Sequence, residues 1–246
     1  MSFVVFTSDK YVSLVEGFSY LFNKFWDDTQ HVHVLGFDAP QFELPSNFTF
    51  ISAGKQSDFP DKAFCGPFKK ILEELPCTTL TYFLEDTYIV GHVQKDIYAE
   101  AKKLVLDRAA HKVELFWGAS NHYITSKAYN TTFRAFHDEV DYRCNLAPSI
   151  VDKEYFLSFF EDHYGVHEFE VANMGKARSD GKNILLSWRS PICRWFNLIR
   201  HGKFNTTNWN EGLDSPKGIY GWNKYQVFSP EMQEYISQYE NWSVDD

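Results

Sequence analysis

The chain has 246 residues, of which 44% are hydrophobic and 18% aromatic, and its formal net charge is −9 at pH 7. This composition can fill a full hydrophobic core, which excludes an intrinsically disordered protein. The acidic balance disfavours a broad nucleic-acid-binding face, because such affinity comes mainly from Lys and Arg side chains that neutralise phosphates.

The sequence also bears on the compartment. No window approaches the roughly 20 apolar residues of a membrane span, and the first residues lack the basic region of a signal peptide. The four cysteines show neither CxxC nor zinc spacing, as expected of free thiols in a reducing compartment. We therefore expect a cytoplasmic protein without structural zinc or a transmembrane segment.

The first part of the chain alternates between strands and helices. Short apolar runs predict strands over residues 3–6, 31–37 and 48–52, and apolar residues at helical spacing predict helices over 12–26, 64–75 and 97–105. Thr7, Ser8 and Asp9 are good N-cap residues ahead of the first helix. The alternation is typical of a nucleotide-binding α/β half, which we assign to residues 1–107 and which lacks a GxGxxG motif.

One strand in this half carries the main functional signal. Residues 78–84 form an apolar and β-branched run that ends abruptly in two carboxylates, Glu85 and Asp86. Such a run is typical of a central strand, and open α/β sheets bind their ligands at the carboxyl ends of their strands. The alternative is a solvated acidic turn.

The second part, residues 108–246, has shorter elements and is predicted to be the acceptor half of the same domain. Strand-like pieces occupy residues 112–117, 121–125 and 183–188. Asp152 is a plausible N-cap for an aromatic helix that reaches Phe160. Residues 205–221 are rich in Asn and Gly and are predicted to be a mobile loop before a last helix over 230–239.

Four polar features lie at predicted strand ends or loops. They are Thr7-Ser8-Asp9, Gly54-Lys55-Gln56, Glu85-Asp86 and His201-Gly202-Lys203. The first three would converge at one edge of a parallel sheet. Together with the basic turn they could hold Mg²⁺ or Mn²⁺ and a diphosphate, because carboxylate oxygens suit these metals and Lys and His balance phosphate charge. Considered singly, Asp9 is better interpreted as a helix N-cap and His201 as a surface histidine.

A second acidic segment contains Glu168 and Glu170. On a strand the two would share a face, whereas on a helix they would diverge. Either could be a general base for an acceptor hydroxyl, and Phe169 and Tyr164 could supply a stacking surface for a sugar. The alternative is a solvated helix start, where acidic residues are favoured by the helix dipole.

These segments, in this order, resemble bacterial and phage glycosyltransferases of the GT-A type. The resemblance covers about residues 4–204 and rests on Ser8-Asp9-Lys10-Tyr11, Val34-Leu35-Gly36-Phe37, Phe50-Ile51-Ser52-Ala53-Gly54, Leu84-Glu85-Asp86-Thr87-Tyr88, Ala147-Pro148-Ser149-Ile150-Val151 and Glu168-Phe169-Glu170. It implies a single α/β domain over residues 1–246, with a Rossmann-like N-terminal half and a mixed central sheet flanked by helices.

The resemblance also implies roles for individual residues. Thr7 to Asp9 would border the nucleobase and ribose of a nucleotide-diphosphate sugar, and Asp86 would be the ligand of Mn²⁺ or Mg²⁺ and the diphosphate. Glu85 would support the ribose or a metal-bound water. Glu170, or failing it Glu168, would be the base of an inverting displacement, and His201 with Lys203 would meet the diphosphate.

Three functions are compatible with the sequence. The leading one is a glycosyltransferase whose acceptor is a surface glycan or a lipid-linked sugar. A phage enzyme that glycosylates a hydroxymethylated base in DNA uses the same chemistry; the basic tract over residues 176–203 favours it and the net charge disfavours it. A non-catalytic carbohydrate-binding protein, in which Glu85 and Asp86 are structural, is an alternative of another class.

Overall fold

A computed structural model describes residues 1–115, 126–188, 190–200, 202–205 and 230–241. In its first half the elements are β1 (Ser2–Phe6), α1 (Leu14–Phe25), β2 (Val32–Gly36), β3 (Phe48–Ser52), the 3-10 helix η1 (Gln56–Asp58), α2 (Cys65–Glu74), β4 (Thr79–Leu84), β5 (Thr87–Gly91) and α3 (Lys95–Leu106). In its second half they are β6 (Lys112–Glu114), β7 (Ser126–Ala128), β8 (Phe133–Phe136), β9 (Ser149–Asp152), α5 (Lys153–Leu157), α6 (Val166–Ala172), α7 (Met174–Ala177), β10 (Ile184–Ser187), β11 (Arg194–Asn197), β12 (Ile199–Arg200), β13 (Lys203–Phe204) and α10 (Pro230–Ser237).

Strands from both halves of the chain form one mixed sheet. Within the described residues it has nine strands in the order β3-β2-β1-β4-β9-β6-β10-β8-β7. Strands β1 to β4 are mutually parallel, and β9 runs antiparallel to both β4 and β6. The carboxyl ends of β1, β2, β3, β4 and β6 therefore lie at one edge of the sheet, which we call the carboxyl edge.

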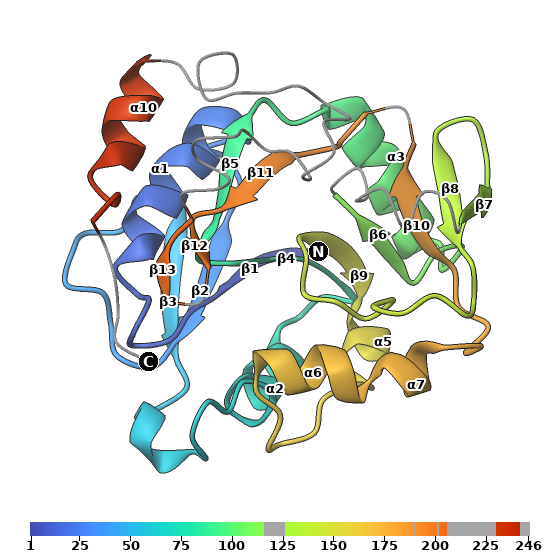
Figure 1. The fold of residues 1–246 in the computed structure, drawn as a ribbon, viewed down its shortest axis with the longest axis horizontal. Coiled ribbons are helices and arrows are strands. Elements are labelled where there is room, and N and C mark those ends of the chain that lie inside the picture. The colour runs from blue at the N-terminus through green and yellow to red at the C-terminus, as the bar shows by residue number, and fades with distance from the viewer. Residues whose placement is uncertain (116–125, 189, 201, 206–229, 242–246) are drawn as a thin grey trace.

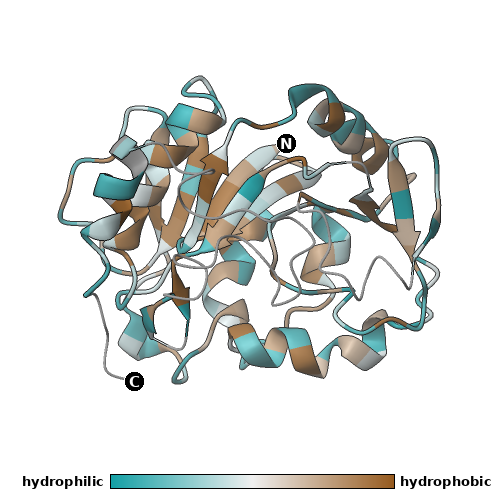
Figure 2. Ribbon diagram, turned by 45° about the horizontal axis from the view of Figure 1, so that its top comes forward, coloured by the Kyte–Doolittle hydropathy of each residue, from teal (hydrophilic) through white to brown (hydrophobic). Residues whose placement is uncertain are grey.

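Helices cover both faces of this sheet (Figure 1). Apolar residues of α1, α3 and α10 pack with one face of the strands, and those of α2, α5, α6 and α7 pack with the other. The central strands are largely apolar, while the helices alternate between polar and apolar residues (Figure 2). This arrangement confirms the predicted α/β class with a mixed central sheet flanked by helices.

Several predicted elements are confirmed and several are corrected. The strands at 3–6, 31–37, 48–52, 78–84 and 183–188 and the helices at 64–75, 97–105 and 230–239 are present with small shifts at their ends. Asp152 is an N-cap, and its carboxylate accepts a hydrogen bond from the Tyr155 amide at 2.9 Å. The helix after it ends at Leu157, short of the predicted Phe160.

The predicted N-cap role of Asp9 is wrong. Helix α1 begins at Leu14 with Ser13 in the N-cap position, and the Asp9 carboxylate instead accepts a hydrogen bond from the Asp38 amide at 2.8 Å. The strand predicted at 121–125 and nearly all of the loop predicted at 205–221 lie outside the described residues. No helix in the described part of the chain has the length and apolarity needed to cross a membrane.

Candidate functional site: an acidic turn at the carboxyl edge

Glu85 and Asp86 form the turn between two strands. Strand β4 ends at Leu84, and β5 leaves the main sheet at Thr87 to pair antiparallel with β11. The Glu85 amide donates to the carbonyl of Phe6 at the end of β1, at 3.2 Å, so the turn is fixed to the neighbouring parallel strand. Glu85 is 8% exposed and Asp86 is half-buried. A carboxylate pair therefore lies at the carboxyl edge, as predicted.

Both carboxyl groups of this turn resist ionisation. Burial raises the pKa of Glu85 well above its ordinary value, and the adjacent charge of Asp86 raises it further. Burial also raises the pKa of Asp86, to about 7, although hydrogen bonds from its own backbone and from the backbone of Ile199 oppose that shift. Perturbed pairs of this kind are typical of functional sites, because a proton or a cation is needed to offset their charge.

A basic hairpin packs against the acidic turn. The Leu198 amide donates to the carbonyl oxygen of Asp86 at 2.7 Å, and β12 and β13 follow directly as a hairpin in which Arg200 pairs with Lys203. Both of these cationic side chains are exposed. The structure thus brings the segment containing Lys203 to the acidic turn, while the predicted ligand His201 lies outside the described residues.

The ends of the first three strands are joined by hydrogen bonds at the same edge. The buried Thr7 donates its amide to the carbonyl of Leu35 at 2.9 Å. Asp9 accepts from the Asp38 amide with its carboxylate and donates its own amide to Gln56 Oε1 at 2.9 Å. The loops that follow β1, β2 and β3 are therefore tied together, and Ser8 lies between the two residues that tie them.

Gly54 and Lys55 lie in the loop after β3. Gly54 has φ of +102°, a left-handed conformation that favours glycine, and its amide donates to Ser52 Oγ at 3.1 Å. A Cβ atom there would meet no other atom within 4 Å, so the backbone is open to an approaching group. Lys55 is exposed immediately before η1.

Glu168 and Glu170 both lie on α6 and diverge, as expected for a helix. Glu170 Oε1 accepts a hydrogen bond from the Leu146 amide at 2.7 Å. Glu168 is exposed and lies over the helix start, since its Oε2 would be 2.6 Å from a Cβ on Gly165. The residue between them, Phe169, is fully buried in the core and offers no stacking surface, contrary to the prediction.

One buried polar cluster near this segment was not predicted. Lys112 and Glu114 on β6 are 2% and 4% exposed, and their charged atoms lie 3.5 Å apart. Asn145 hydrogen-bonds both side chains. Burial lowers the pKa of Lys112, although the charge of Glu114 opposes that shift. Two opposite charges at a spacing of two in a short strand were the available sequence signal.

The donor atoms at the turn suit a hard divalent cation. Among the described residues, no three His, Cys, Asp or Glu side chains gather closely enough to hold a metal ion by themselves. Mg²⁺ commonly binds through one or two carboxylates together with substrate phosphates and water. The Glu85–Asp86 pair fits that mode, because a cation would relieve the repulsion that contributes to the raised pKa of Glu85.

The described residues of the basic tract over 176–203 do not form one face. Helix α7, at one end of the tract, packs with α6 beneath the sheet, whereas β11 pairs with β5 on the opposite side (Figure 1). Arg178 forms an ion pair with Asp141, and Lys176 donates to the carbonyl of Ser158. The fold therefore separates the cations that a nucleic-acid groove would have to align.

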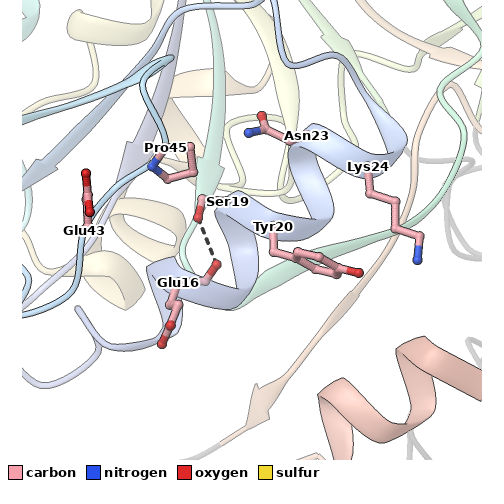
Figure 3. A pocket seen from close by; sticks show the side chains of 7 residues that line it. All are labelled: Glu16, Ser19, Tyr20, Asn23, Lys24, Glu43 and Pro45. Atoms are coloured by element: carbon pink, nitrogen blue, oxygen red, sulfur yellow. Dashed lines mark hydrogen bonds between the residues drawn. The ribbon is translucent and has the colours of Figure 1, made fainter.

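A surface pocket lies apart from the carboxyl-edge residues. It has a volume of about 580 Å³, is open to solvent, and is lined on the outer side of α1 by Glu16, Ser19, Tyr20, Asn23, Lys24, Glu43 and Pro45 (Figure 3). No predicted site residue within the described part of the chain lines it.

Neither a protein-family model nor a curated protein matches the sequence. A crystal structure of S. aureus TarS 1–349 is similar with a TM-score of 0.47 and 14% identity, covering 76% of this chain and 58% of that chain. The same TarS fragment in complex with UDP gives 0.47 and 13%, covering 76% and 57%. Galactosyltransferase LgtC, in complex with donor and acceptor sugar analogues, gives 0.42 and 11%, covering 70% and 69%.

This chain thus spans somewhat more than half of the TarS 1–349 chain. With TM-scores below 0.5 and identities of 11–14% for these three structures, the likeness is a partial one. A function for this chain is therefore inferred from its own strand order and hydrogen bonds.

Proposed function

We propose that this chain is a glycosyltransferase that moves a sugar from a nucleotide-diphosphate donor to an acceptor hydroxyl. The observation that supports this most directly is the contact between the Glu85–Asp86 turn and the hairpin that carries Arg200 and Lys203. A carboxylate pair whose charge a cation would offset and a hairpin that presents cations meet at the carboxyl edge. That combination suits a diphosphate bound with a divalent metal.

The donor would lie along the carboxyl edge. The joined loops at Thr7, Ser8 and Asp9 would border the nucleobase and ribose. The open backbone at Gly54 and the exposed Lys55 would border the same nucleoside end. Arg200 and Lys203, together with the predicted His201, would face the diphosphate, whose charge they would balance as it leaves.

Asp86 would be the principal ligand of Mn²⁺ or Mg²⁺, and Glu85 would support it through the ribose or a metal-bound water. When bound, the cation supplies charge stabilisation for the leaving diphosphate. The backbone of the turn has a separate task. The Glu85 amide and the Asp86 carbonyl oxygen fix the turn between β1 and the segment before the hairpin, so that both carboxylates would lie where the diphosphate enters.

Glu170 is the better placed of the two candidate bases. The Leu146 amide fixes its Oε1, and Oε2 can accept a proton from an acceptor hydroxyl. In an inverting displacement the hydroxyl oxygen bonds to the sugar C1 as the bond from C1 to the diphosphate breaks, and the hydroxyl proton moves to the carboxylate. Glu168, folded over the helix start, is the second choice.

A thermal-unfolding panel tests the proposal. UDP-, GDP-, CMP- and TDP-sugars are added with and without Mn²⁺, and at least one donor should raise the unfolding temperature in a Mn²⁺-dependent way. No stabilisation by any donor would overturn the enzyme assignment and favour a carbohydrate-binding protein. Stabilisation by a donor that is independent of Mn²⁺ would overturn the metal-binding role of Asp86.

The acceptor is tested with the donor that the panel identifies. Nucleotide release is followed after addition of a glycan, a lipid-linked sugar or DNA that contains hydroxymethylated bases. We expect release with one of the sugar acceptors, because the basic tract is split between two sides of the sheet. Release with modified DNA alone would establish the alternative acceptor.

A further inference from the structure

We propose that Asn145 is a positioning residue that holds the Leu146 amide on the Glu170 carboxylate. The inference rests on the proposed function, in which Glu170 takes the acceptor proton. Asn145 lies in the loop that leads into β9. Because β9 is antiparallel to β4 and β6, this loop reaches the sheet at the carboxyl edge.

The side chain of Asn145 uses its full hydrogen-bonding capacity. Its Nδ2 donates to Glu114 Oε1 at 2.6 Å and to the Tyr142 carbonyl at 2.8 Å. Its Oδ1 accepts from Lys112 Nζ at 2.8 Å and from the Ala147 amide at 3.0 Å. An asparagine amide offers two donors and two lone pairs, and here all four are engaged, which leaves one orientation for the side chain.

The backbone of Asn145 is held as firmly. Its carbonyl accepts from Lys112 Nζ and from the Tyr82 hydroxyl, each at 2.9 Å. Tyr82 belongs to β4, three residues before the acidic turn, and Lys112 belongs to β6. Two strands of the central sheet therefore fix the carbonyl of the peptide group to which the Leu146 amide belongs.

The outcome of this anchoring is the direction of one N–H group. The Leu146 amide donates to Glu170 Oε1 at 2.7 Å, a charge-assisted hydrogen bond that orients the carboxylate. The Asn145 carbonyl and the Leu146 N–H belong to one planar peptide group, so the N–H cannot rotate away without breaking the carbonyl's bonds to Lys112 or Tyr82. The position of Glu170 thus depends on a residue that does not touch it.

The free-energy cost of burying Lys112 and Glu114 favours a positioning role for the cluster over a purely stabilising one. Burying an ion pair such as Lys112–Glu114 commonly gains no more than an apolar pair of equal size would, because desolvation offsets the attraction. A saturated polar cluster instead specifies one geometry. Here the specified geometry is that of residues 145–147, and it directs the Leu146 amide toward the Glu170 carboxylate.

The test compares Asn145→Ala with Asn47→Ala. Asn47 donates two hydrogen bonds, to Asn23 Oδ1 and the Gln30 carbonyl, and none of these contacts is with the proposed base. Amide hydrogen exchange at Leu146 needs no substrate. It should quicken at least tenfold in Asn145→Ala and stay unchanged in Asn47→Ala, with overall folding checked by circular dichroism. Unchanged exchange at Leu146 in Asn145→Ala would overturn the inference.

Kinetics with the identified donor and acceptor separate positioning from folding. Asn145→Ala should lower kcat at least tenfold with donor KM within twofold of wild type, because the donor contacts lie elsewhere. The double variant Asn145→Ala/Glu170→Gln should be no slower than Glu170→Gln alone, since both act through one group. Additive losses would contradict the inference. Failure of the wild-type protein to bind any donor would instead contradict the proposed function. The hydrogen-exchange result would still show whether Asn145 holds the Leu146 amide on Glu170.

Discussion

The amide of Leu198 donates a hydrogen bond to the carbonyl oxygen of Asp86 at 2.7 Å, which joins the segment before the basic hairpin to the acidic turn at the end of β4. The Ile199 backbone adds a hydrogen bond at the same residue. These contacts join an acidic turn and a basic hairpin, the two kinds of charge that a metal–diphosphate site needs. The turn and the hairpin come from opposite halves of the chain.

The first prediction concerns pH and Asp86. Its pKa in the folded protein is about 7, against an ordinary value of 3.8. Between those values the folded state holds a proton that the unfolded chain releases, so Asp86 makes the free energy of unfolding fall as pH rises from about 4 to 7. Asp86→Asn should therefore unfold at a higher temperature than wild type at pH 8 and at nearly the same temperature at pH 4.

Asp27→Asn is the matched control, with the opposite sign. The hydrogen bond from Lys95, followed by those from Thr29, lowers the pKa of Asp27 to about 2. The contribution of Asp27 to the free energy of unfolding is present above about pH 4 and is lost as pH falls toward 2. The Asn variant should thus unfold at a lower temperature than wild type at pH 7. If Asp86→Asn is also less stable than wild type at pH 8, the pKa of Asp86 is not raised in the folded protein.

The second prediction concerns the support of the acidic turn by α1. Tyr88, two residues after Asp86, donates its hydroxyl to the Leu14 carbonyl at 3.0 Å. A Cβ on Gly17 would lie 2.2 Å from that hydroxyl oxygen. Gly17→Ala should therefore lower the free energy of unfolding by roughly 1–3 kcal/mol through overpacking, as measured by urea denaturation.

Gly175→Ala is the control for the glycine. Gly175 lies on helix α7, and a Cβ there would meet no atom within 4 Å. Relief of the glycine's backbone entropy should raise the free energy of unfolding by up to about 1 kcal/mol. Equal effects of the two substitutions would mean that Tyr88 does not pack on Gly17.

The third prediction concerns the basic hairpin. Lys203→Ala should weaken binding of a nucleoside diphosphate about tenfold and leave binding of the nucleoside unchanged, because the side chain is assigned to the phosphates and not to the base. Isothermal titration with both ligands measures the difference. Lys70, exposed on α2 and paired with Glu74, provides a control, since Lys70→Ala should change neither affinity. A parallel loss for nucleoside and diphosphate would place Lys203 elsewhere.

The fourth prediction concerns the nucleoside end of the donor. Asp9 joins the loops after β1 and β2 through its bond to the Asp38 amide. Asp9→Ala should therefore raise the donor KM about fivefold to tenfold, in line with the loss of a charge-assisted hydrogen bond, and change kcat by less than twofold. Asp58→Ala on the exposed side of η1 is the control and should leave both constants unchanged. A large loss of kcat at constant KM would contradict a binding role.

The sequence was informative where one short segment determines its own structure. The apolar run before Glu85 predicted both the central strand and the exit of two carboxylates at its end, and the aromatic periodicity predicted α1 and α2. Strand β5 was missed, because residues 87–91 continue the same apolar pattern after the turn. Periodicity alone does not show that a strand leaves the sheet.

Long-range partners were beyond sequence reasoning. The ion pair of Lys112 and Glu114 is indistinguishable in sequence from two solvated charges, since its burial depends on a loop that approaches more than thirty residues later. The N-cap assignment of Asp9 failed for the same reason. Its partner, the Asp38 amide, comes from the loop after β2, 29 residues along the chain.

The most direct test of the account is turnover by Asp86→Asn. Release of nucleotide from the donor that stabilises the wild-type protein is measured in the presence of Mn²⁺ and acceptor, together with the unfolding temperature of each protein. If Asp86 is the metal ligand, the variant is folded and at least as stable as wild type at pH 8, and its turnover is lower by about a thousandfold or more. A folded variant with wild-type turnover would contradict that role.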